Sequence, residues 1–455
     1  MRVLPMLSLA AFFAAGLVGL ACGSSDSSPP TATPSDAGSD IGETSVATDA
    51  PGTNALFPAF TPTDPPQVAT LGGAVMATPK IVPVFFAGDD PTVVAAMTDF
   101  TKKVGQTDYW KAAAMEYGVG PATGGDPIQL TAPDNPPSTI DDSAIQAWLV
   151  AKLNADDPAF GTPDANTIYT LFYPQGVTVT LGGVQSTGDA GAEGGTDAAT
   201  PPGAQASCTS FGGYHQNVVL DAAHGGKTIA YAVVPRCPNF GGLTGIDVLS
   251  GAGSHELLEA ATDPFPLAKP AFVQVDDAHI YWETLLGGGE IGDMCAQFAG
   301  SFVKFPELPA YTVQRTWSNK AITAGQDPCV PVPAGQVYFN SLPVLNDTVP
   351  FSVQGQTINV KGVHIAAGQS ATVELDLYSI APTSGPWTVS AKDGNELRGQ
   401  AAQLTFAFDK TTGQNGDKIQ MTITVATANK RNRETFAVLS KLGGQTSMWV
   451  GLVGN

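Results

Sequence analysis

The sequence carries few positive charges: 21 lysines and arginines stand against 41 aspartates and glutamates, a formal net charge of -20 at pH 7. It also lacks a basic stripe with interleaved aromatic residues that could override this acidity. A phosphate backbone would be repelled by such a chain. We therefore expect no nucleic-acid partner.

Cysteine is scarce, and none of the five cysteines forms a Cys-x-x-Cys pair. This absence disfavours a four-cysteine zinc site. Apart from Cys22, the chain has Cys208, Cys237, Cys295 and Cys329, an even number that suits disulfides in an oxidising compartment. Of the three possible pairings we favour Cys208 with Cys237 and Cys295 with Cys329, because each pair closes a moderate loop around the suspected site.

The N-terminus indicates export. Arg2 precedes an apolar run from Leu4 to Leu20, and Ala21-Cys22-Gly23 follows. Residues 1–22 thus have the features of a signal peptide that ends in a lipobox, with an ordinary secretory signal as the alternative. Cys22 should become the lipidated first residue and anchor the protein in a membrane. An inner-membrane retention signal would usually have Asp directly after the cysteine, so Gly23 favours the outer membrane or cell surface.

At 455 residues the chain is too long for one ordinary core, so more than one folded unit is expected. Residues 23–66 are rich in Ser, Pro, Thr and Asp and should form a disordered tether. Residues 183–206 resemble them and should be a disordered insertion. These tracts predict a first domain over 67–333 and a second over 334–455.

The first domain interleaves predicted strands and helices. Short apolar runs at 80–87, 167–173 and 228–234 indicate buried strands, and helical spacing of apolar residues occurs at 93–104 and 143–153. This order predicts an α/β or α+β domain.

The second domain has a different pattern. Alternating runs at 371–378, 403–408 and 419–425, with Asn-Gly and Asp-Gly turns between strands, predict an all-β, immunoglobulin-like sandwich. Trp387 and Trp449 should lie in or near its core. An exposed aromatic platform for sugar is the alternative.

The chain has only five histidines, and one of them begins a His-Glu-x-x-Glu motif. His255 and Glu259 are four residues apart, so on a helix they project from one face and could share a metal ion. Glu256 is placed like a general base. The helix is predicted to start with Thr244 as its N-cap and to end before Pro264.

A zinc ion that activates water normally needs three protein ligands and one open position. Glu290, Asp293 and His215 are the candidates to complete the site, which would make this domain metallohydrolase-like. Zinc is the expected ion, although calcium would suit an oxygen-rich version. His279 and His224 rank lower, because no recurring ligand spacing surrounds them. The alternative is an ion-paired helix face that holds no metal.

Several segments between Lys80 and Pro331 together resemble the EXORDIUM-like, phosphate-induced protein 1 family and its bacterial relatives. They are Gly-Tyr-His215, Ala230-Tyr-Ala-Val-Val-Pro, Ser-His255-Glu-Leu-Leu-Glu259-Ala-Ala-Thr-Asp-Pro, Glu290-Ile-Gly-Asp293-Met-Cys295, Val313-Gln-Arg-Thr-Trp317-Ser and Cys329. The resemblance implies an extracellular protein, linked in plants to growth responses, with no established reaction. In plant members a cysteine usually adjoins the glycine of the Gly-Tyr/Phe-His motif, whereas Cys208 lies several residues earlier.

The sequence thus favours a lipid-anchored surface protein with a zinc-dependent, peptidase-like hydrolase site around His255, Glu256 and Glu259. Its substrate would be a peptide or a cell-surface polymer. The alternative is a noncatalytic surface-binding or adhesion protein in which the His255 region is structural. The oligomeric state stays open.

Overall fold

The computed structural model describes residues 56–182, 205–353, 356–429 and 431–454. The predicted signal peptide with Cys22, most of the 23–66 tether and residues 183–204 of the insertion lie outside these ranges. Within them, no helix combines the length and apolar character needed to cross a membrane.

A mixed sheet forms the centre of the first domain, in the strand order β3-β2-β6-β10-β9. β2 (Lys80–Phe85), β6 (Thr167–Tyr173) and β10 (Thr228–Pro235) run parallel, while β9 (Tyr214–Val219) pairs antiparallel with β10 at one end. The short strands β3 (Thr123–Gly124) and β4 (Ile128–Gln129) pair with β2. Strands were expected at 80–87, 167–173 and 228–234, and all three are confirmed.

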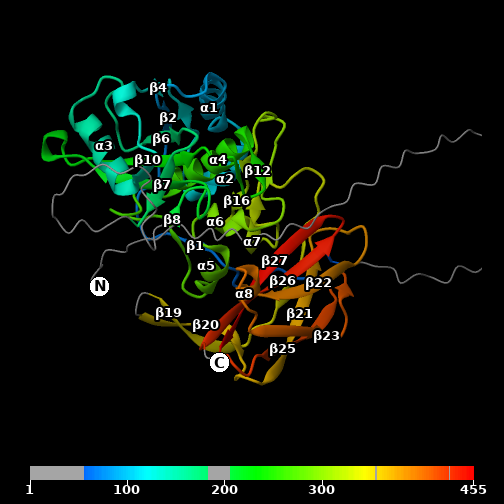
Figure 1. The fold of residues 1–455 in the computed structure, drawn as a ribbon. Helices are drawn as coiled ribbons and strands as arrows, with labels where there is room; N and C mark the ends of the chain where they lie inside the picture. Colours follow the sequence, from blue (N-terminus) through cyan, green and yellow to red (C-terminus); the bar gives the residue numbers. More distant parts are fainter. Residues whose placement is uncertain (1–55, 183–204, 354–355, 430, 455) are drawn as a thin grey trace, which may run out of the picture.

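Helices cover both faces of this sheet (Figure 1). Alternate strand residues contribute to two separate apolar cores, because successive side chains of a strand point to opposite faces. Among the described residues, the helices α1 (Pro91–Val104), α2 (Asp108–Ala114) and α4 (Ile246–Thr262) pack on one face, and α3 (Asp142–Asn154) packs on the other. The domain is therefore a three-layer α/β structure.

The boundaries of α4 follow from backbone chemistry. The helix begins after Gly245, which has φ +56° and no side-chain cap, so the prediction of Thr244 as N-cap was wrong by one residue. Asp247, in the first turn of the helix, accepts a hydrogen bond from the Thr312 amide and pairs with Lys304. Pro264 lies just beyond the end, because proline cannot continue a helix.

Residues 263–330, which follow α4, add short elements to the first domain. They include α5 (Tyr281–Leu286), α6 (Asp293–Ala296), β14 (Phe302–Val303), β15 (Val313–Gln314), β16 (Thr316–Trp317), α7 (Asn319–Thr323) and β17 (Cys329–Val330). Both favoured disulfides form: Cys208–Cys237 and Cys295–Cys329. Remaining small ladders join β1 (Val68–Ala69) to β13 (Gln274–Val275), β11 (Asn239–Phe240) to β12 (Leu243–Thr244), and β5 (Thr139–Asp141) to β7 (Thr178–Leu181) and β8 (Gln205–Ala206).

The second domain is a two-sheet β-sandwich. One sheet has the order β18 (Phe339–Pro343), β21 (Ser370–Ser379), β25 (Lys418–Val425) and β23 (Leu404–Phe408). The other has β19 (Asp347–Val353), β20 (Gln356–His364), β27 (Gln445–Gly454), β26 (Arg433–Leu442), β22 (Trp387–Asp393) and β24 (Thr412–Gly413). Side chains from both sheets form one core that contains the fully buried Trp387, as expected.

Tryptophans join the two domains. Trp282 of α5 makes edge contacts with Trp317 at 5.8 Å and with Trp449 of β27 at 5.4 Å between ring centroids. All three belong to one apolar core that runs from the first domain to the sandwich. Trp449 was expected in or near the sandwich core, and it lies where the domains meet.

Two predicted boundaries need correction. Residues 56–66, assigned to the tether, lie against the sandwich: Asn415 donates to the Leu56 carbonyl, and the Phe60 ring packs on Tyr378. Gln205 and Ala206, assigned to the insertion, form β8. In both places local composition suggested disorder, but partners distant in the sequence supply the contacts that order the chain.

We expect Trp449→Ala to destabilise the protein by about 3 to 5 kcal/mol, since large-to-small changes in a core lose apolar burial and leave a cavity. Urea unfolding followed by far-UV circular dichroism would measure the free energy. Val219→Ala, at a side chain that is 53% exposed, serves as the control and should change it by less than about 0.5 kcal/mol. A Trp449→Ala effect no larger than that of the control would contradict the packing role of this tryptophan.

Candidate metal centre

Three of the predicted site residues lie on α4. His255 and Glu259 are one turn apart, and His255 Nε2 lies 3.0 Å from Glu259 Oε2, so the expected shared face is confirmed. Glu256 Oε1 lies 3.9 Å from the same imidazole nitrogen. These side chains sit inside a helix that is buried on all sides from Gly253 to Thr262. Buried charges of this kind require a partner.

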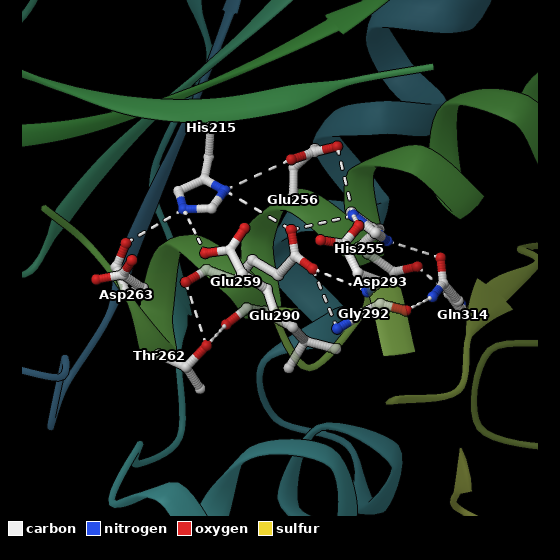
Figure 2. Close-up of polar contacts among 12 residues, drawn as sticks. His215, His255, Glu256, Glu259, Thr262, Asp263, Glu290, Gly292, Asp293 and Gln314 are labelled. Carbon is white, nitrogen blue, oxygen red and sulfur yellow. Dashed lines mark hydrogen bonds and ion pairs between the residues drawn. The ribbon is translucent and has the colours of Figure 1, made fainter. Parts of the chain in front are cut away.

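Residues distant in the sequence complete the cluster (Figure 2). His215 reaches it from β9, with Nδ1 3.6 Å from Glu256 Oε2 and Nε2 3.6 Å from Glu290 Oε1. Asp293 of α6 places Oδ1 3.7 Å from His255 Nε2. The structure thus brings all six predicted residues of the site together.

Two glycines make this convergence possible. A Cβ on Gly292 would lie 2.7 Å from both Glu259 Oε1 and His255 Nδ1, and one on Gly213 would lie 2.8 Å from Glu256 Oε1. Real Cβ atoms essentially never come so close to other atoms. Glycine therefore allows the chain before β9 and the chain before α6 to approach the charged face of α4.

Gln314 fixes the orientation of His255. Its amide nitrogen donates to the Gly292 carbonyl at 2.6 Å, which leaves Oε1 as the acceptor 2.8 Å from His255 Nδ1. A proton on Nδ1 then satisfies Gln314, and Nε2 faces Glu259 and Asp293. An imidazole held in this way by its other nitrogen is the usual arrangement of a metal ligand.

Glu259 and His215 are oriented by backbone groups. Glu259 Oε1 accepts hydrogen bonds from the amides of Gly292 and Asp293, both at 3.1 Å, so Oε2 is the oxygen that faces the imidazoles. His215 Nε2 lies 3.2 Å from the carbonyl oxygen of Asp263. With that nitrogen as donor, His215 Nδ1 faces Glu256 and Glu259.

The cluster is strongly acidic. Burial, followed by the charges of neighbouring carboxylates, raises the pKa of Glu290 well above its usual range and that of Asp293 to about 8. Burial opposes a charge on His255, but the charges of Glu259 and Glu256 outweigh it and raise its pKa well above the usual value. Burial also opposes a charge on Glu259, whose pKa is nevertheless lowered by His255. Within the described residues, the ion pairs of these carboxylates are all with histidine.

These groups fit a divalent metal. Two sets of side chains bring ligand atoms within 4.8 Å of one another: His215, Glu259 and Glu290, and His255, Glu256 and Glu259. Each set combines one imidazole with two carboxylates, donors that suit zinc and similar transition metals. Calcium takes oxygen ligands, so the two imidazoles favour the transition metals.

The sequence did not reveal every member of the site. Gln314 and Asp263 carry no spacing signal, because their roles arise from contacts with residues 59 and 48 positions away. His224 pairs instead with Asp221, and His279 with Asp276, as their lower ranking anticipated.

No protein-family model and no curated protein matches this chain. Domains 1–6 of the surface-layer protein SbsC match with 17% identity over 25% of this chain and 13% of theirs, at a TM-score of 0.16. SbsC domains 4 and 5 match with 14% identity over 31% of this chain and 89% of theirs, also at 0.16. A FixG-related protein from Vibrio parahaemolyticus matches with 11% identity over 26% of this chain and 95% of that one, at 0.17. Likenesses at these scores assign neither a fold class nor a function.

We expect the metal-free protein to lose stability as the pH rises from about 5 to about 8. The folded-state pKa of Asp293 is about 8 against an ordinary value of 3.8, and that of His255 is raised as well. The native state therefore binds more protons than the unfolded chain in this range, and the stability so gained is lost on deprotonation. The pKa of Glu259 is lowered from 4.5, so this group makes stability rise with pH, but only below the range considered.

Urea midpoints measured across this range in the presence of EDTA would check the trend. Asp293→Asn should make the slope shallower, because one of the groups with a raised pKa is removed, whereas Asp277→Asn, at an exposed position, should leave it unchanged. Parallel pH profiles for the wild type and Asp293→Asn would contradict the assignment.

Proposed function

We propose that the first domain is a zinc-dependent hydrolase of the peptidase type, built on His255, Glu256 and Glu259. The observation that carries this proposal is the 3.0 Å approach of His255 Nε2 to Glu259 Oε2, with Glu256 facing the same point. His255 and Glu259 would hold the ion, and His215, Glu290 or Asp293 would supply the further ligands.

A bound zinc ion would supply Lewis acidity and lower the pKa of water. Glu256 would accept the proton of the attacking water. Burial, acting against the charges of His255 and His215, raises the pKa of Glu256 above its usual value, which brings it closer to the range useful for a general base. Gln314 would hold the ring of His255 in place through Nδ1.

A noncatalytic protein with a structural metal is the second candidate, favoured by the burial of the site. The side chains of His215, His255, Glu256, Glu259, Glu290 and Asp293 are only 2 to 11% exposed. A substrate needs an open approach, whereas a structural ion does not. In this version the sandwich, as an immunoglobulin-like module, would bind a cell-surface polymer.

The proposed setting is the cell surface. The two disulfides suit an oxidising compartment outside the cytoplasm. A lipid on Cys22 would tether the protein to the outer membrane, with a peptide or surface polymer as substrate. Membership of the EXORDIUM-like family would agree with this setting. The cluster includes His215, Glu290 and Asp293, which belong to the segments that resemble this family.

Glu256→Gln should lower peptide hydrolysis by at least about 100-fold, because it removes the base. The bound zinc should stay close to the wild-type content, since His255, Glu259 and the remaining ligands are untouched. A peptide-library digest and metal analysis would provide the two readouts. Glu396→Gln, at a side chain that is 51% exposed, is the matched control and should match the wild type in both.

Equal hydrolysis by Glu256→Gln and the wild type would remove Glu256 as the base. Bound zinc without hydrolysis in the wild type would favour the structural candidate. A wild type that binds no zinc, as purified or after reconstitution, would overturn both versions.

Gln314→Leu should weaken zinc binding by about 10- to 100-fold, the usual effect of removing a group that orients a histidine ligand. Competition with a chromogenic chelator would measure the affinity. Gln297→Leu, at an exposed position just after α6, makes the same chemical change away from His255 and should have no effect. Similar affinities for the two variants would show that Gln314 does not orient the ligand.

A further inference from the structure

We infer that this cluster holds two divalent transition-metal ions rather than one, with Glu259 shared between them. The inference rests on the proposed function, because it needs the site to bind metal. It goes further by assigning each histidine to its own ion and by giving Glu290 a specific ligand role.

The arrangement of donors divides into two halves. One set consists of His255, Glu256 and Glu259, and the other of His215, Glu259 and Glu290. Glu259 belongs to both because its inward oxygen, Oε2, lies 3.0 Å from His255 Nε2 and 3.8 Å from His215 Nδ1. Its other oxygen is held by two backbone amides. This carboxylate is therefore anchored on one side and directed between the two imidazoles on the other.

Glu256 also faces both halves. Its Oε1 lies 3.9 Å from His255 Nε2, and its Oε2 lies 3.6 Å from His215 Nδ1 (Figure 2). Glu256 therefore faces the space between the two imidazoles, where a pair of ions would lie about 3.5 to 4 Å apart, as in two-metal hydrolytic sites. A base in this position would accept a proton from a water molecule that lies between the two donor sets.

Glu290 provides a separate observation. It is 2% exposed, and its Oε1 has no hydrogen-bond partner although it points toward His215. Buried carboxylate oxygens are normally satisfied. An ion held by His215, Glu259 and Glu290 would give this carboxyl group a ligand role, whereas an ion placed only between His255 and Glu259 leaves Oε1 without a hydrogen-bond partner.

The charge of the cluster points the same way. Glu256, Glu259, Asp263, Glu290 and Asp293 are five buried carboxyl groups, and histidines that bind metal are neutral. With all five ionised, one divalent ion leaves a net charge of about -3 in the buried site, and two leave about -1. The second ion removes most of the remaining cost of burying these groups.

Metal stoichiometry tests this inference directly. The full chain, purified in detergent, is analysed as isolated and after dialysis against zinc chloride, and bound zinc is counted by mass spectrometry against protein from amino-acid analysis. We expect two equivalents in the wild type and in Glu396→Gln. His215→Gln and Glu290→Gln should each retain one, because each alters only the half formed with His215. Manganese in place of zinc adds an electron paramagnetic resonance readout, and neighbouring ions should give a spin-coupled signal.

The outcomes separate the two proposals. One equivalent in the wild type and in both variants would overturn the two-ion centre and leave the single-metal hydrolase in place. No bound metal would overturn both. Two equivalents with an uncoupled manganese signal would also reject the shared Glu259. Far-UV circular dichroism reports whether His215→Gln folds, and the near-isosteric Glu290→Gln repeats the test if it does not.

Discussion

The structure depends on the groups that compensate the charges of one buried helix. α4 is surrounded by the apolar core, yet its central turns present His255, Glu256 and Glu259. Such groups are tolerated only when other groups or ions compensate them. Backbone amides donate to Glu259, Gln314 accepts from His255, and the remaining acidic excess is the charge that the proposed metal would balance.

The surrounding helices, strands and disulfide hold these partners in position. β9 places His215 over the charged face of the helix, and Glu290, just before α6, and Asp293, its first residue, approach the same face. The Cys295–Cys329 disulfide begins two residues after Asp293 and ties this segment to β17. A site assembled from irregular segments needs such restraints, because loops alone fix side chains less well than regular elements do.

The interface between the domains has a related role. Trp282 and Trp317 flank the part of the chain that carries Glu290 and Asp293, and Trp449 of the sandwich packs against Trp282. The sandwich therefore supports the chain that lines the site, as well as forming a unit of its own. This gives a physical reason for the second domain even if it binds no ligand.

The sequence determined much of this protein through local rules. Short apolar runs located the main strands of the first domain, Pro264 marked the end of the helix of His255, and the four-residue spacing placed His255 and Glu259 on one face. Only the tertiary structure decided which distant groups meet them, that Gln314 and Asp263 orient the two imidazoles, and that residues 56–66 are ordered. The physical reason is that these contacts join segments far apart in the chain, where neither spacing nor composition records which groups will be neighbours.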